Sequence, residues 1–335
     1  KKNTMGIYLN NRRVAFFALL LTIVSLLYSS TLQAPFNFDD QVVIKIETME
    51  GGNPEAGAAF HNLYPPSNRH LFYLSLIFNY SLGELNPFGY HLVNSSLHFF
   101  TSIVIFFIAF ITIKKGLSLN KKDALSIASI TTLLFSINPV HSETVNYISA
   151  RAVGMSSFFY LSSLLSFILG SFRERKPLPR FLLYFLSLTF FLASVLSKET
   201  ALTFPIALLL YDICFMQKNC WAPVKSRLLF FYLPLLLCSL LVVSTVISLK
   251  DLIIYFWQRI DIGYGLKQIQ IIGHGIRLLL FPIGLTFDYD FPNAFFSHTS
   301  ILATAILIVL GIFLAITLHS PKVLAMGSFC ALWFL

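Results

Sequence analysis

The chain has 335 residues, of which 56% are hydrophobic and only 12% are charged. Soluble globular domains carry about 25% charged residues, so this composition excludes a soluble domain and predicts an all-α polytopic membrane protein. The formal net charge is +9, but the basic residues stand in short clusters between apolar runs. Such clusters are typical of loops that set orientation in a bilayer, and we expect no binding to nucleic acid.

Apolar runs that approach the roughly 20 residues of a membrane-spanning helix recur along the whole sequence. Two further runs, 71–84 and 268–287, are expected to be interfacial or re-entrant helices, since the second contains His274 and Arg277. The sequence therefore predicts about nine spans: 14–32, 90–113, 124–137, 153–170, 181–197, 201–215, 228–249, 299–318 and 323–335.

The charges separate between the two sides of this layout. If residue 1 lies on the inside, 16 of the 24 basic residues fall on the inner side and 12 of the 15 acidic residues on the outer side. Lys and Arg collect in cytoplasmic loops, so this bias predicts the orientation of the chain. The side chains suited to chemistry are then expected on the outer side, beginning with an outer loop at about 33–70.

The first outer loop contains the stretch FNFDDQ, residues 36–41. A loop acid just beyond a helix end is often a solvated turn residue. Here Asp39 and Asp40 are adjacent and lie among aromatic residues, and low-dielectric surroundings disfavour two neighbouring negative charges. One of the two carboxylates is therefore a candidate base near neutral pH.

The stretch INPVHSETVNYISAR, residues 137–151, is polar between two apolar runs. Pro139 ends the preceding helix, and His141, Glu143 and Arg151 follow it. An amphipathic connector at the membrane surface would explain this stretch. A cation at the start of a membrane helix is costly unless it pairs or holds an anion, so Arg151 is also a candidate anion ligand.

The stretch SVLSKETALTFP, residues 194–205, places Lys198 and Glu199 between two apolar runs with almost no loop. One interpretation is that the two side chains pair with each other or reach to the membrane surface. The other is that Lys198 and Arg151 together bind a phosphate group at the outer surface.

The stretch GYHLVNSSLHFF, residues 89–100, puts His91, Asn94, Ser95 and His98 on one face of a helix. A hydrogen-bonded polar face that packs on a neighbouring helix is the favoured interpretation. Metal ligation by the two histidines is a weaker alternative, because no third ligand stands at a known spacing.

The stretch GHGIRLLLFPIGLTFDYDFP, residues 273–292, joins Arg277 to Asp288 and Asp290 across an apolar hairpin. We interpret it as a second polar wall of the same outer cavity.

Five blocks in this order resemble the protein O-mannosyltransferase-like membrane enzymes that often carry C-terminal tetratricopeptide repeats. One position departs from the pattern, because Asn138 stands where the family usually has a histidine before Pro-Val-His. The blocks cover about residues 30–292 and read FNFDD, RHLFYLSLIFNYSLGELNPFGYHLVNSSLHF, NPVHSETVNYISARAVG, SKETALTFPIALLLYD and IRLLLFPIGLTFDYDFP.

The resemblance implies a glycosyltransferase of the GT-C class, with a multi-helix transmembrane core and a sugar donor carried on a polyprenyl phosphate. It implies transfer with inversion to an acceptor hydroxyl of a protein or glycan on the non-cytoplasmic face, with Asp39 as the base. Asp40 would orient the acceptor, and the two acids would hold a divalent metal such as Mg or Mn if one is required. The expected donor-phosphate ligands are Arg151, Lys198 and Arg277, and the expected substrate contacts are His141, Glu143, Arg69, His91, Glu199, Asp288 and Asp290.

Two other classes of protein fit the same sequence. A transporter or flippase of a lipid-linked substrate would also have intramembrane cations and a polar cavity, although no inverted repeat is visible. A noncatalytic membrane scaffold is the third possibility. We expect a single transmembrane domain over 1–335, truncated before any repeat domain, in a bacterial inner membrane with the site facing the periplasm. The endoplasmic reticulum is the alternative compartment.

Overall fold

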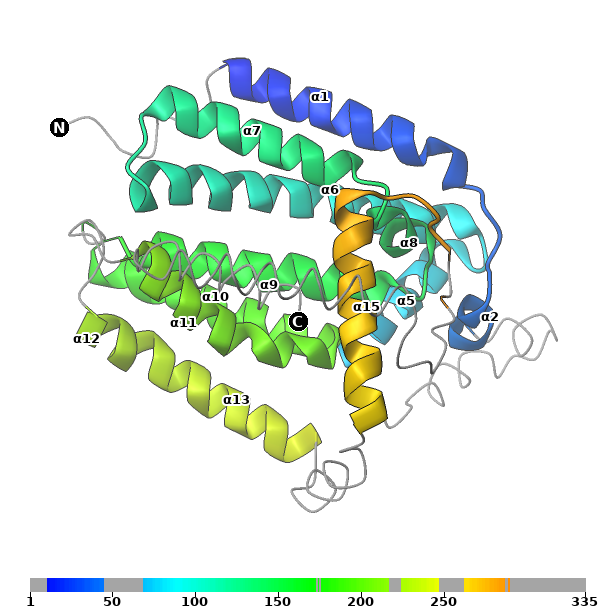
Figure 1. The fold of residues 1–335 in the computed structure, drawn as a ribbon. Coiled ribbons are helices and arrows are strands. Elements are labelled where there is room, and N and C mark those ends of the chain that lie inside the picture. The colour runs from blue at the N-terminus through cyan, green and yellow to red at the C-terminus, as the bar shows by residue number, and fades with distance from the viewer. Residues whose placement is uncertain are drawn as a thin grey trace. The chain divides into compact units, whose positions relative to one another are not determined.

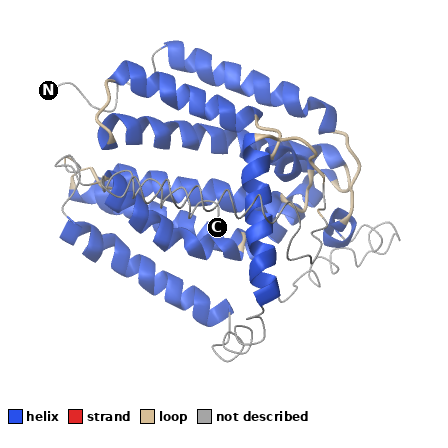
Figure 2. Ribbon diagram, viewed as in Figure 1, coloured by secondary structure: helices blue, strands red, loops and turns tan. Residues whose placement is uncertain are grey.

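The computed structural model describes residues 11–44, 69–172, 174, 176–216, 224–246, 262–286 and 289. Figure 2 shows that this part of the chain is made of helices and connecting loops, without a strand. The all-α membrane class predicted from the composition is confirmed. The chain divides into two compact units: unit 1 comprises Lys1–Gly170 with Leu178–Ala201, and unit 2 comprises Ser171–Pro177 with Leu202–Leu335. A single transmembrane domain over the whole chain stays a prediction.

Unit 1 is built around the helix α6, which contacts α1, α7 and α9. These four helices lie side by side in Figure 1, and successive long helices run in opposite directions. Apolar side chains fill the contacts between them, as expected for helices that bury one face against a neighbour. The long helices of unit 1 are α1 (Asn11–Tyr28), α6 (Pro87–Ile111), α7 (Lys121–Ile137), α9 (Arg151–Gly170) and α10 (Pro177–Ser197).

Local sequence signals fix where the central helices begin. The side chain of Asn86 accepts a hydrogen bond from the backbone N of Phe88, and Pro87 occupies the first turn of α6. Asn120 caps α7 in the same way, since its side chain accepts from the backbone N of Asp123 at 2.9 Å. Both caps satisfy backbone donors that the first helical turn leaves without partners.

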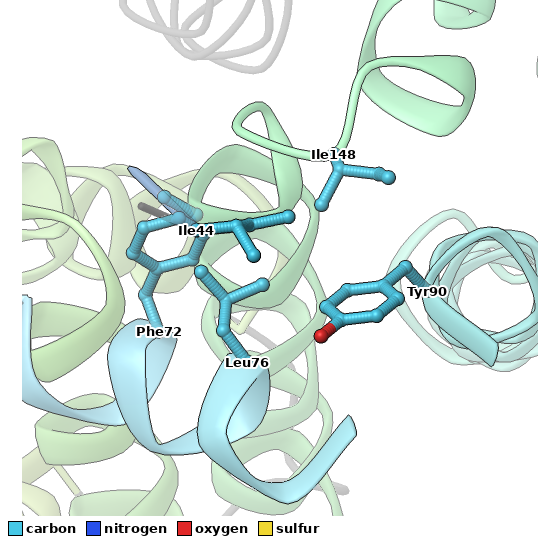
Figure 3. Packing of buried hydrophobic residues seen from close by; sticks show 6 residues of the cluster. Ile44, Phe72, Leu76, Tyr90 and Ile148 are labelled. Atoms are coloured by element: carbon cyan, nitrogen blue, oxygen red, sulfur yellow. The ribbon is translucent and has the colours of Figure 1, made fainter. Parts of the chain in front are cut away.

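Short elements gather at one end of unit 1, which we call the α2 end. A cluster of buried apolar residues joins α2 and α5 to α6 and to the start of α9, and Figure 3 shows Ile44 of α2 above Phe72 and Leu76 of α5, with Tyr90 and Ile148 beside them. Because each of these side chains is at most 2% exposed, the cluster fixes α2 to the bundle. The elements are η1 (Ser29–Thr31), α2 (Asp39–Ile44), α5 (His70–Gly83), α8 (His141–Asn146) and η3 (Glu199–Thr203), whose last two residues belong to unit 2.

The opposite end of unit 1 carries basic side chains. The guanidinium of Arg13 lies 5.2 Å from the ring centre of Phe110, and the ammonium of Lys114 lies 5.5 Å from the same ring. The start of α1 and the end of α6 therefore meet there, while the acids of α2 and α8 lie at the α2 end. Within unit 1, the predicted separation of basic and acidic residues is a separation between the two ends of the bundle.

Small polar residues line the contact between α9 and α10. The hydroxyl of Ser194 donates to the carbonyl of Ser156 at 2.8 Å, and the hydroxyls of Ser163 and Ser187 each donate to the other's carbonyl at 2.7 and 2.8 Å. Gly170 continues this seven-residue spacing on α9, and a Cβ there would lie 2.9 Å from the ring of Tyr184. Small residues allow two membrane helices to approach closely and to hydrogen-bond across their contact.

Unit 2 is organised around a buried ion pair. The guanidinium of Arg227 donates to both oxygens of Asp212, at 2.9 and 2.7 Å, and the hydroxyl of Tyr232 donates to the same carboxylate at 2.9 Å. These bonds tie α11 to the helical segment that follows it. The elements of unit 2 are α11 (Phe204–Phe215), α12 (Val224–Arg227), η4 (Leu228–Tyr232), α13 (Leu233–Val246) and α15 (Ile262–Leu280).

Five helices in the described part of the chain are long and apolar enough to cross a membrane. The expected run 124–137 lies in α7, which has 17 residues, and the run 201–215 contains α11, which has 12, so neither meets the length of a span. The expected spans 299–318 and 323–335 lie outside the described residues. The five helices are Arg13–Thr31, Pro87–Gly116, Arg151–Gly170, Pro177–Ser197 and Val224–Leu241.

Candidate functional site

The two adjacent acids of the first loop have different surroundings. Asp40 is 2% exposed, and its Oδ1 accepts hydrogen bonds from the backbone N and the Oγ of Ser149, at 2.7 and 2.6 Å. Its Oδ2 accepts from the backbone N of Asn37 at 3.3 Å. A buried carboxylate with these partners is held in one orientation. This arrangement favours a positioning role over the acceptor contact that we predicted for Asp40.

Asp39 is exposed and is the first residue of α2. Its backbone N donates to the hydroxyl of Tyr147 at 3.1 Å, and the same hydroxyl hydrogen-bonds to the Asp39 carboxylate. Phe38, just before it, has a φ of 48°, a region that bulky residues rarely adopt. This turn directs the two neighbouring carboxylates into different surroundings, one buried and one exposed.

Arg151 is completely buried at the start of α9. Its Nε donates to Asn94 Oδ1 at 2.8 Å, its Nη1 to Asn79 Oδ1 at 2.6 Å and its Nη2 to the carbonyl of Tyr90 at 2.9 Å. Nη1 also lies 3.3 Å from two oxygens of Ser75. These bonds join α9 to α5 and α6. The geometry favours a structural role for Arg151 in place of the phosphate contact predicted from the sequence.

Charged residues form a corner where α10 ends and α5 begins. Arg69 donates from Nε and Nη2 to the two oxygens of Glu199, at 3.1 and 2.7 Å. The bond from Arg69 lowers the pKa of Glu199 and, in return, raises the pKa of Arg69. Glu199 therefore pairs with a residue far away in sequence, and the pairing with Lys198 that we considered is not the one formed.

Lys198 stands beside this ion pair. Burial lowers the pKa of its ammonium, and the positive charge of Arg69 lowers it further, while Glu199 and Glu143 raise it. Within the described part of the chain, no hydrogen bond or ion pair occupies the Lys198 ammonium. Its positive charge is thus half-buried and open to an anion.

The helix α8 connects the acidic pair with this corner. Glu143 interacts electrostatically with Lys198, and Tyr147, four residues later, holds Asp39. Tyr147 follows directly after α8 in an extended conformation, so the short segment from Glu143 to Tyr147 reaches both sets of polar groups at this end of unit 1. This end offers an exposed carboxylate and a cation, the groups that a transfer to a hydroxyl with a phosphate leaving group would use.

The three histidines of this region lie in contacts between the helices of unit 1, and the substrate contacts predicted for His91 and His141 stay predictions. His91 bonds through Nε2 to the carbonyl of Ala34, and His98 bonds to the carbonyl of Ser136, both at 3.1 Å. The ring of His141 lies 4.2 Å from that of Phe135. Burial, followed by the charge of His98, lowers the pKa of His141 to about 4. Of the polar face predicted for α6, His91, Asn94 and His98 are hydrogen-bonded, whereas Ser95 Oγ is buried without a partner in the described part of the chain. His141 is a neutral aromatic at neutral pH.

The described residues include no group of three or more His, Cys, Asp or Glu side chains arranged to hold a metal ion. The oxygens of Asp40 accept hydrogen bonds from Ser149 and Asn37. A divalent metal at Asp39 and Asp40 stays a prediction.

The second polar wall is described only in part. Arg277 belongs to unit 2, and its Nη2 donates to the carbonyl of Ile283 at 3.2 Å. Asp288 and Asp290 lie outside the described residues. The substrate contacts predicted for these acids, and the phosphate contact predicted for Arg277, stay predictions.

Sequence reasoning missed the pairs of residues that hold the site together. Tyr147 and Ser149 fix the two acids, and Asn79 and Asn94 receive Arg151. All four stand within the polar blocks quoted above, but their partners lie 57 to 109 residues away in the sequence, with Asp39 and Tyr147 separated by 108. Spacing within one block cannot predict such pairs.

Comparisons with known proteins confirm the resemblance. The chain is 29% identical to the human protein O-mannosyl-transferase TMTC3 over 215 residues, which are 59% of this chain and 22% of that protein. It is 29% identical to Drosophila melanogaster Tmtc1 over 225 residues, covering 64% and 24% of the two chains. It is 35% identical to human TMTC2 over 154 residues, covering 42% and 17%.

The chain spans about a sixth to a quarter of the length of these curated relatives. No protein-family model matches it. No solved structure matches it either.

Proposed function

We propose that this chain is the membrane part of a glycosyltransferase of the GT-C class. It moves a sugar, mannose by analogy with the names of its relatives, from a polyprenyl-phosphate donor to an acceptor hydroxyl on a protein or glycan. The observation that carries the proposal is the exposed Asp39 carboxylate, held by Tyr147 at the end of unit 1 where Lys198 also lies.

Asp39 is the general base of this reaction. As the acceptor oxygen attacks the anomeric carbon, the hydroxyl proton passes to the Asp39 carboxylate. The bond between the anomeric carbon and the phosphate oxygen breaks, and the lipid phosphate leaves with the electron pair. A single displacement of this kind inverts the configuration at the anomeric carbon.

Lys198 receives the negative charge of the leaving phosphate. A cation already present where charge develops stabilises the transition state without reorganising water. The partial burial of Lys198 strengthens such an interaction, because nearby water screens it less. The phosphate contact predicted for Arg277, in unit 2, stays a prediction.

The exposed charged residues of the corner are candidates for substrate contact. Glu143 is exposed on α8, and the side chains of Arg69 and Glu199 are 38% and 46% exposed. Exposed polar groups can exchange a water or an ion-pair partner for a sugar hydroxyl at small cost.

The site faces the non-cytoplasmic side in this proposal. The charge bias of the sequence supports that orientation, since the basic end of unit 1 is the end expected in the cytoplasm. The bacterial inner membrane expected from the sequence finds no support among the relatives reported above, which are animal proteins. The endoplasmic reticulum was the alternative, and the compartment stays a prediction.

Donor turnover with purified protein in detergent tests the proposal. The donor is dolichyl phosphate carrying radiolabelled mannose, and the acceptor is a membrane extract. We expect labelled product with the wild type and a loss of about 100- to 10,000-fold with Asp39→Asn, the size of a general base contribution. Equal product from the two proteins would overturn the role of Asp39.

A flux assay in proteoliposomes separates the enzyme from the transporter. An enzyme leaves a covalent product only when acceptor is present, whereas a carrier moves labelled donor across the bilayer without any product. Movement without product would replace the proposed function with transport.

A further inference from the structure

We infer that Tyr147 and Ser149, which stand between α8 and α9, are positioning residues that fix Asp39 for proton transfer. This inference rests on the proposed function. Tyr147 acts on Asp39 directly, and Ser149 acts through Asp40.

The contact of Tyr147 uses both functions of a phenol. Its hydroxyl accepts from the backbone N of Asp39 at 3.1 Å and hydrogen-bonds to the carboxylate of the same residue. A hydroxyl has one donor and two acceptor sites, so both bonds can exist together. The side chain of Asp39 is otherwise exposed at the start of a six-residue helix. Tyr147 therefore limits the directions that this carboxylate can take.

The contact between Ser149 and Asp40 fixes the turn that carries both acids. Its backbone N and Oγ both donate to Asp40 Oδ1, at 2.7 and 2.6 Å, and Asp40 is 2% exposed. Two residues later, Arg151 joins α9 to α5 and α6 through Asn79, Asn94 and Tyr90. The segment from Tyr147 to Arg151 thus connects the acidic turn to the rigid part of the bundle.

Charge gives Asp40 a second reason to be buried. Asp40 interacts electrostatically with the buried side chains of Arg151 and His91. The hydrogen bonds of Arg151 go to Asn79, Asn94 and Tyr90, and Asp40 adds a nearby negative charge that favours the buried cation. The two acids then have separate tasks: Asp39 meets the substrate, and Asp40 anchors the turn.

The isosteric pair Asp39→Asn and Asp40→Asn tests this separation. Asparagine at position 40 retains an oxygen that can accept from Ser149, so we expect kcat to fall about 10-fold and the thermal midpoint to fall because Arg151 loses its nearby charge. Asparagine at position 39 removes the base, so kcat falls about 100-fold or more and the thermal midpoint stays unchanged. Equal losses of kcat in the two variants would overturn the separation.

Hydroxyl deletions test the two positioning residues. We expect Tyr147→Phe and Ser149→Ala to lower kcat about 10-fold while the KM for dolichyl phosphate mannose stays unchanged, because the donor site is left intact. Ser149→Thr, which keeps the hydroxyl, should recover most of the rate. An unchanged kcat in both deletions, or a change in KM alone, would overturn the inference.

Two matched controls remove similar bonds elsewhere. Tyr232→Phe deletes a hydroxyl that donates to the Asp212 carboxylate in unit 2, and Ser136→Ala deletes a buried serine hydroxyl that donates to Ser102 Oγ between α7 and α6. Both should leave kcat unchanged. If they lower kcat as much as Tyr147→Phe and Ser149→Ala, the effect is one of general stability and the inference fails.

Amide hydrogen exchange makes the test independent of turnover. We expect Tyr147→Phe to accelerate exchange in residues 37–41 and Asp40→Ala to accelerate it around Ser149, since each variant removes an acceptor of a backbone N–H. If the wild type transfers no mannose but the two variants exchange faster as expected, the proposed function fails while the positioning contacts stand. Unchanged exchange would overturn the contacts themselves.

Discussion

Two ion pairs in this protein share one geometry and differ in their surroundings. Arg227 with Asp212 in unit 2 and Arg69 with Glu199 in unit 1 are both bidentate, and each has a closest contact of 2.7 Å. The side chains of the first pair are 2% and 9% exposed, whereas those of the second are 38% and 46% exposed. Burial, and not the distance between charges, decides what each pair does.

The buried pair is structural. Removal of one partner would leave an uncompensated charge in an apolar environment, which costs far more than the bond itself. The exposed pair keeps water around both charges, so its loss costs little and its groups remain accessible to a substrate. The comparison teaches that the corner beside Lys198 keeps its charged groups accessible to a substrate, while the similar pair in unit 2 stabilises the fold.

The largest effect is expected at the buried pair. Arg227→Ala should lower the free energy of unfolding by about 3–5 kcal/mol, because Asp212 is left buried and unpaired. Chemical denaturation in detergent, followed by circular dichroism, measures the change. The double variant Arg227→Met with Asp212→Leu should recover most of the loss. A loss below about 1 kcal/mol in the single variant would place this pair in the same class as the exposed one.

An intermediate effect on stability is expected at the buried ring of His141 in unit 1. His141 has a folded pKa of about 4, lowered by burial and the charge of His98, so between pH 6.5 and 4 the unfolded chain binds a proton that the folded chain does not. The stability contributed by neutral His141 is therefore complete above about pH 6.5 and falls as the pH decreases to about 4.

The loss should reach about 1–3 kcal/mol in the wild type and should be much smaller in His141→Phe, which keeps the aromatic packing. Unfolding curves measured at pH 7 and pH 4.5 provide the comparison. The same pH dependence in both proteins would show that burial does not hold this ring neutral.

The smallest effect on stability is expected at the exposed pair. Glu199→Gln should lower the free energy of unfolding by less than about 1 kcal/mol. Adding 1 M salt to the wild type should lower it by a similarly small amount, because salt screens the exposed pair. The pKa of Glu199 is lowered by Arg69, so the small contribution of the pair is present above about pH 4.5 and is lost as the pH falls through the folded pKa. Mannose transfer should nevertheless fall, because Arg69, without its partner Glu199, would compete with Lys198 for the donor phosphate. Unchanged transfer would remove the corner from the site.

The sequence predicted the class of fold because composition and apolar runs report directly on the bilayer. The positions of α9 and α10 agree with the expected spans 153–170 and 181–197, and the helix at 71–84 is short, as expected for a segment that does not span. The expected span 201–215 is longer than the helix α11 found there, which has 12 residues. In α11, apolar residues continue from η3, which is a separate turn, so the run overstates the length of one helix.

The sequence pointed to the charged residues of the candidate site but did not show which residues they bond to. The pattern of adjacent acids identified Asp39, but it could not show that Asp40 turns inward to meet Ser149. A cation at the start of α9 was interpreted as an anion ligand, although Asn79 and Asn94, neutral residues on other helices, satisfy it. The sequence shows which groups are costly to bury, but the tertiary fold decides which partners they find.

The serine contact between α9 and α10 fixes the register of the two helices. It admits one register, because a slip by one helical turn, about 5.4 Å, would separate Ser156 from Ser194 and Ser163 from Ser187 together. Arg151 begins α9 and Lys198 follows the end of α10. The register of the two helices therefore sets how far the segment before Arg151, which holds Asp39 and Asp40, lies from Lys198 along the helix axes. A larger residue at Gly170, about 28 Å along α9 from Arg151, would shift α9 along α10 and so change the position of the segment that holds Asp39 and Asp40 relative to Lys198.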